Sequence, residues 1–67
     1  MEPWLKIYIT KSPAQASIIQ GMLEENNIPV QVMNKQSSSF NFGDIEVYVP
    51  GHLAETASQL MATNMLN

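Results

Sequence analysis

The chain has 67 residues, about half the usual length of one domain, so we expect a single small domain spanning residues 1–67. Three Lys and no Arg stand against six acidic residues, and the net charge of −3 makes nucleic acid a poor partner. The 45% apolar share excludes an acidic disordered tail, and the absence of Cys excludes disulfides, zinc–thiolate sites and thiol catalysis. Because the sequence shows no signal-peptide core and no membrane-spanning apolar run, we expect a cytoplasmic protein without a membrane partner.

The first predicted element is a strand from Pro3 to Thr10, in which apolar residues alternate with period two. Its strongly apolar inward face is predicted to hold Leu5, Ile7 and Ile9. The intervening residues are predicted on the outward face: Trp4, Lys6 and Tyr8.

A helix is predicted to follow, because Ser12 suits the N-cap, Pro13 the first helical position, and Gln15 the position three residues after the cap. Apolar residues then share one side of this helix: Ala16, Ile18, Ile19, Met22 and Leu23. Asn26-Asn27 is expected to end the helix, since Asn tolerates the left-handed conformation found just past helix ends.

Two further strands are predicted to form a hairpin with a long loop. The first runs from Ile28 to Asn34, and Pro29 favours an edge position because it cannot donate a ladder hydrogen bond. The second contains the alternating residues 45–49, preceded by Phe40 and Phe42 on its outward face. The intervening Ser37–Ser39 run is expected to be a plain hairpin tip, with a phosphorylated or ligand-covering loop as the alternative.

A second helix is predicted from His52 onward, with an apolar stripe formed by Leu53, Ala57, Leu60, Met61 and Met65. The order β-α-β-β-α predicts an α+β, ferredoxin-like fold. Its sheet would hold three antiparallel strands in the order 1-3-2, with both helices on one face. The first strand would then lie at a sheet edge.

Five segments of the chain carry a family resemblance: Trp4-Leu5-Lys6-Ile7-Tyr8, Ala16-Ser17-Ile18-Ile19, Leu23-Glu24, Ile28-Pro29-Val30 and Ile45-Glu46-Val47-Tyr48-Val49-Pro50. In this order and spacing they resemble a small bacterial family of unknown function, catalogued as "putative prokaryotic signal-transducing proteins". The resemblance covers nearly the whole chain. It implies a ferredoxin-like fold related in shape to nitrogen-regulatory PII proteins, and no catalytic motif of the family can be placed here.

Residues suited to catalysis or metal binding are few. His52 and Glu55 have a spacing that can share a metal, but no second His and no Cys completes a ligand set. A serine nucleophile would depend on the same single His, and the adjacent acids of Glu24-Glu25 diverge on a helix. The sequence therefore predicts no catalytic residue, no metal and no cofactor.

Two features of the sequence suit binding. Lys11 and Ser12, where the first strand meets the first helix, form a candidate anion site, although Ser12 is first expected to be an ordinary N-cap. The outward sheet face is the stronger candidate, since two helices cannot also cover it. Its predicted residues are Trp4, Lys6, Tyr8, Met33 and Tyr48.

The outward face favours a protein contact, because Trp, Tyr and Met are enriched in interface cores. RNA stacking on these aromatic rings is an alternative that the net charge opposes, and simple shielding of the sheet is another. We therefore expect a non-enzymatic regulatory or protein-interaction module that acts in signal transduction. It is expected to form a homodimer through its uncovered sheet face or its first strand, and to bind a further protein. The alternative is a small-ligand sensor, similar to PII or ACT domains, which binds a metabolite between subunits.

Overall fold

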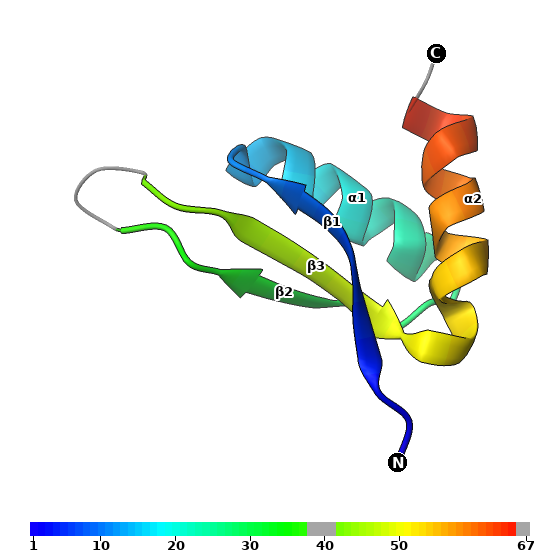
Figure 1. Ribbon diagram of the computed structural model, residues 1–67. Coiled ribbons are helices and arrows are strands. Elements are labelled where there is room, and N and C mark those ends of the chain that lie inside the picture. Colours follow the sequence, from blue (N-terminus) through cyan, green and yellow to red (C-terminus); the bar gives the residue numbers. More distant parts are fainter. Residues whose placement is uncertain (38–41, 66–67) are drawn as a thin grey trace.

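The chain is described by a computed structural model, which covers residues 1–37 and 42–65. Its elements are β1 (Trp4–Thr10), α1 (Pro13–Glu25), β2 (Gln31–Asn34), β3 (Ile45–Pro50), the 3₁₀ turn η1 (Gly51–Leu53) and α2 (Ala54–Met65) (Figure 1). The predicted β-α-β-β-α order is confirmed. Ser38 and Ser39 of the expected hairpin tip, and Phe40 of the expected third strand, lie outside the described residues.

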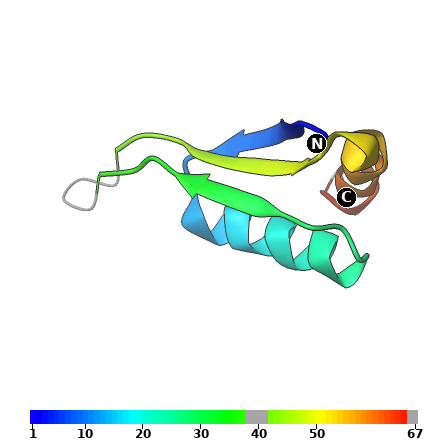
Figure 2. The same ribbon diagram turned by 90° about the horizontal axis from the view of Figure 1, so that it is seen from below.

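The three strands form one antiparallel sheet in the order β1-β3-β2, which confirms the predicted topology and places β1 at an edge. Helix α1 runs along one face of this sheet (Figure 2). Ala57 and Met61 of α2 join the same buried cluster as the inward residues of β3. The result is the predicted α+β, ferredoxin-like layout, in which the opposite sheet face has no helix over it among the described residues.

Helix α1 begins and ends as the sequence predicts. Ser12 Oγ accepts a hydrogen bond of 3.2 Å from the backbone N–H of Gln15, and Pro13 occupies the first turn. Asn27 adopts a φ of 62°, and the N–H of Ile28 donates to the carbonyl of Leu23 at 3.0 Å. This Schellman arrangement satisfies late helix carbonyls and turns the chain back toward the core.

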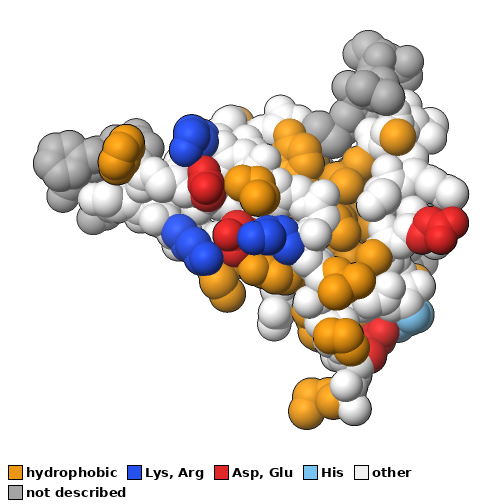
Figure 3. Space-filling view, viewed as in Figure 1, with side chains coloured by type: hydrophobic (Ala, Val, Ile, Leu, Met, Phe, Trp, Pro, Cys, Tyr) orange, Lys and Arg blue, Asp and Glu red, His pale blue; other side chains and the backbone are white. Residues whose placement is uncertain are grey.

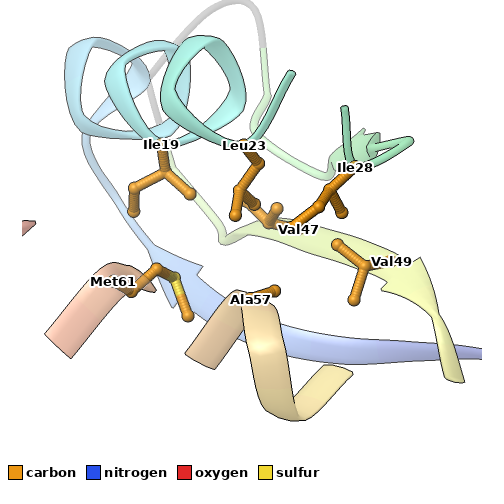
Figure 4. Close-up of a cluster of buried hydrophobic side chains, with 7 residues drawn as sticks. All are labelled: Ile19, Leu23, Ile28, Val47, Val49, Ala57 and Met61. Carbon is orange, nitrogen blue, oxygen red and sulfur yellow. The ribbon is translucent and has the colours of Figure 1, made fainter. Parts of the chain in front are cut away.

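The core lies between the helices and the inward face of the sheet. Figure 4 shows its buried side chains: Ile19, Leu23, Ile28, Val47, Val49, Ala57 and Met61. Of the apolar side predicted for α1, Ile18 departs from expectation, since 61% of its surface is exposed. Successive helix residues are rotated by about 100° around the helix axis. When Ile19 points directly at the sheet, Ile18 therefore points to the side, where the three-stranded sheet does not cover it.

A β-bulge at Ile7 changes the predicted faces of β1. The two strands pair in one register before Ile7 and in another after it, so that Tyr8 lies opposite Val47 and Ile9 opposite Glu46. Because Val47 is fully buried, Tyr8 turns inward and packs against the core. The outward placement of Tyr8 and the inward placement of Ile9 were therefore wrong, since one extra residue reverses the alternation that follows it.

The hairpin is shorter than its sequence pattern suggests. Strand β2 starts after Pro29, and β3 starts only at Ile45, so Phe42 does not belong to β3 and instead forms an isolated bridge with Ser37. Gly43 separates this bridge from β3 with a φ of +110°. A Cβ atom at Gly43 would lie 2.6 Å from the carbonyl oxygen of Lys35, so this tight connection requires glycine.

Candidate functional site

The sheet face opposite α1 gathers side chains from all three strands around the middle of β3. Ile9 of β1 and Met33 of β2 lie on either side of Glu46, while Lys6 and Gln31 lie on either side of Tyr48. Residues paired across antiparallel strands share a face. We call this surface the open face and define it by Trp4, Lys6, Ile9, Met33, Lys35, Glu46 and Tyr48.

Glu46 is the centre of a polar network on the open face. Its Oε1 accepts a hydrogen bond of 2.8 Å from the Tyr48 hydroxyl and lies 3.3 Å from Lys35 Nζ, and its Oε2 lies 3.2 Å from Lys6 Nζ. Only 8% of the Glu46 side chain is exposed. Because no backbone element of the described chain covers this face, the carboxylate is shielded by its own partners.

These partners set the charge state of Glu46. The Tyr48 hydrogen bond, followed by the contacts with Lys6 and Lys35, lowers the pKa of Glu46 below its ordinary value, although desolvation opposes this shift. The same bond to a carboxylate raises the pKa of the Tyr48 hydroxyl. Glu46 is therefore an ionised, fully held carboxylate at neutral pH and a poor proton acceptor.

Apolar side chains border this network and remain exposed to solvent. Ile9 and Met33 each expose 50% of their surface, and Trp4 is exposed near the start of β1. Figure 3 looks onto this face and shows Lys and hydrophobic side chains next to one another over the sheet. The open face thus combines accessible apolar area with a polar centre whose partners are already in place.

The structure brings together four of the five residues predicted for this face: Trp4, Lys6, Met33 and Tyr48. Tyr8 is absent from it, and Ile9, Lys35 and Glu46 were not among the residues named for it. Lys35 lies two positions after Met33, so strand periodicity could have placed it on the same side. The outward position of Ile9 depends on the bulge, and no pattern in the sequence predicts that bulge.

The candidate anion site has a different arrangement. Lys11 Nζ pairs with Asp44 Oδ1 at 2.9 Å, and Ser12 Oγ caps α1. The side-chain amide of Gln36 donates to the carbonyl of Lys11 at 2.7 Å, which ties the base of the hairpin to the start of α1. These contacts give both residues structural roles, and anion binding by them stays a prediction.

His52 is paired with the N-terminal segment and not with Glu55. Its backbone N–H donates to Glu2 Oε2 at 2.9 Å, and its ring Nδ1 contacts Glu2 Oε1. The backbone hydrogen bond is the main reason that the pKa of Glu2 lies below its ordinary value. Within residues 1–37 and 42–65, no three His, Cys, Asp or Glu side chains gather as a metal site would require, and no pocket is found.

The family match covers the part of the chain that contains the open face. A family model described as "Putative prokaryotic signal transducing protein" matches residues 4–64. The chain belongs to this family. All residues of the open face lie inside the matched range, and the resemblance predicted from the sequence is confirmed. Neither curated proteins nor solved structures gave a match.

The family description connects its members with prokaryotic signal transduction and names no reaction. In the part of the chain that the structure describes, neither helix is long and apolar enough to cross a membrane.

Proposed function

We propose that this chain is a non-enzymatic, cytoplasmic regulatory module, which acts in signal transduction by binding another protein through its open face. One observation carries the proposal. Glu46 is 8% exposed, held by Tyr48 and two lysines, and bordered by half-exposed Ile9 and Met33. Such a surface can be covered by a partner without leaving a buried charge unpaired.

The composition of the open face agrees with protein binding. Trp4, Ile9 and Met33 supply apolar area, and Trp and Met are enriched in the cores of protein interfaces. Tyr48 and the two lysines already hold Glu46, so a partner would meet an ordered polar centre. Groups ordered in advance lose less conformational entropy on binding.

The two sheet edges are less suitable than the face. The bulge at Ile7 divides β1 into two short segments, and Lys6 adds a charge to the first of them. Strand β2 has only four residues and follows Pro29. Bulges, charges, prolines and short strands all discourage a further strand from pairing with an edge.

A homodimer remains part of this proposal, and it would use the same face, so a second copy and another protein partner would compete for it. A chain of this size buries a small core, and a second copy on the open face would cover Trp4, Ile9 and Met33. Sedimentation equilibrium at micromolar concentration should therefore give a mass above that of one chain. Trp4→Ala combined with Ile9→Ala should shift it toward the monomer, whereas a wild-type monomer at high concentration would remove the dimer from the proposal.

Affinity capture from the native host tests the proposed function. The wild-type chain is compared with Ile9→Ser combined with Met33→Ser, and with Ile18→Ser as a matched control. Ile18 is an equally apolar residue that is exposed on α1. The proposal expects a partner that the wild-type chain and the Ile18→Ser variant retain and the double variant loses. A partner lost only with Ile18→Ser would place the interaction on α1.

A further inference from the structure

Positive charge is confined to one side of this molecule. Lys6 and Lys35 both contact Glu46, while the remaining lysine, Lys11, contacts Asp44 two residues before Glu46. Figure 3 shows the lysine side chains together over the sheet. Three lysines against these two acids leave one net positive charge here, within a chain of net charge −3.

The other four acidic residues lie outside the positions that define the open face. They are Glu2 beside His52, Glu24 and Glu25 at the end of α1, and Glu55 in the first turn of α2. An acidic partner would therefore be repelled by the helical side and attracted to the open face. Complementary charge of this kind orients an encounter and suppresses wrong approaches.

We infer that the open face binds an acidic protein segment in which carboxylates alternate with apolar side chains. This inference rests on the proposed function and specifies the chemistry of the partner. The carboxylates would meet Lys6 and Lys35, while the apolar side chains would cover Ile9 and Met33. The partner segment would lie across the sheet and would not extend it at an edge.

The lysines retain the donors that this inference requires. An ammonium group has three N–H donors, and Lys6 and Lys35 each direct one of them to Glu46. Both lysines are exposed, so their other donors face solvent above the carboxylate. A partner carboxylate can therefore bind them while Glu46 keeps its own contacts.

A nucleic acid fits this face less well, although it too is acidic. Nucleic-acid binding depends on neutralising several phosphates at once, and one net positive charge is too little for this. Tyr48 is half-buried, with its hydroxyl on Glu46, and Tyr8 is turned into the core. Among the open-face residues, Trp4 is the only exposed aromatic ring on which a base could stack.

Trp4 is the only tryptophan of the chain and lies on this face, so its fluorescence reports binding directly. The probes are short synthetic peptides in which Leu alternates with Glu, Gln or Lys, together with a single-stranded uridine oligonucleotide. We expect the Glu–Leu peptide to bind most tightly and its affinity to fall as salt is added. Lys35→Gln should weaken it by about fivefold, whereas Glu25→Gln on α1 should not.

Each other outcome overturns the inference in a recognisable way. If the Gln–Leu peptide bound as tightly as the Glu–Leu peptide, or the Lys–Leu peptide bound more tightly, the partner would not be acidic. The open face would still be a protein-binding surface. Tighter binding of the oligonucleotide would replace the protein segment with nucleic acid. If no probe changes the Trp4 emission, the inference fails, while the host capture experiment still decides the proposed function because it assumes no partner charge.

Discussion

The hydroxyl of Tyr48 donates a 2.8 Å hydrogen bond to Glu46, two positions earlier on the outward side of β3. Residues at this spacing lie next to one another on one face of a strand. The bond holds the carboxylate in the middle of the sheet, where Lys6 and Lys35 reach it from β1 and from the end of β2. The centre of the open face is therefore assembled from all three strands.

The charge on Glu46 should make stability depend on pH. Its pKa in the folded chain lies below the ordinary value of 4.5, mainly because of the Tyr48 hydrogen bond. A group with a lowered folded-state pKa stabilises the fold above its unfolded-state pKa, and that stability is lost as the pH falls through the folded-state value. Wild type should therefore melt at a higher temperature than Glu46→Gln at pH 7, and the gap should close in acid.

Glu25→Gln provides the control for this measurement, because Glu25 is exposed at the end of α1. A negative charge near the C-terminal end of a helix is not favoured by the helix dipole, so its removal should not lower the melting temperature at pH 7. A gap between wild type and Glu46→Gln that stays constant from neutral to acid pH would contradict the ionised network.

Two neighbouring isoleucines test the boundary of the core. Ile19 is fully buried, and Ile19→Ala should lower the free energy of unfolding by about 2–5 kcal/mol. Ile18 is 61% exposed on the same helix, so Ile18→Ala should change it by no more than about 0.5 kcal/mol. Denaturant unfolding measures both variants, and similar losses would mean that α1 is rotated relative to the sheet.

The bulge at Ile7 predicts opposite behaviour for the two residues that follow it. Tyr8 packs against the core, so Tyr8→Ala should lower the free energy of unfolding by about 1–3 kcal/mol. Ile9 is outward and half-exposed, so Ile9→Ala should leave stability nearly unchanged while weakening contacts at the open face. If Ile9→Ala lowered the free energy of unfolding more than Tyr8→Ala, the bulge would be contradicted, and Ile9 would face inward as uninterrupted alternation predicts.

Two glycines form a matched pair for the hairpin. Gly43→Ala should lower the melting temperature, because the new methyl group would meet the Lys35 carbonyl and the φ of +110° disfavours alanine. Gly21 lies within α1, and a Cβ atom added there would enter open space, so Gly21→Ala should raise the free energy of unfolding by up to about 1 kcal/mol. A lower free energy of unfolding for Gly21→Ala would contradict the exposure of α1 at Gly21.

Local features of the fold could be predicted from the sequence because neighbouring residues determine them. Ser12, Pro13 and Asn27 act within one turn of chain, and each occupies its predicted place at an end of α1. The strand order also followed from the pattern, since apolar faces and short connections allow few topologies.

The composition of the open face depended on pairing between distant segments. Ile7, Tyr8 and Ile9 all favour strands, and nothing in their order marks which one is the extra residue of a bulge. The contacts of Glu46 with Lys6 and Lys35 depend on the register of two strand pairs. Alternation predicted the outward positions of Trp4, Lys6, Met33 and Tyr48 but not that of Ile9, and the network became visible only when the register was known.

The central claim is that a protein partner contacts the open face. Its most direct test is a map of backbone amide chemical shifts on the isotope-labelled chain, recorded while the partner captured from the host is added. The account predicts that the largest changes occur in β1, at Met33 and Lys35, and around Glu46 and Tyr48. Changes concentrated at Ile18 and Gly21 on α1, with β3 unaffected, would contradict it.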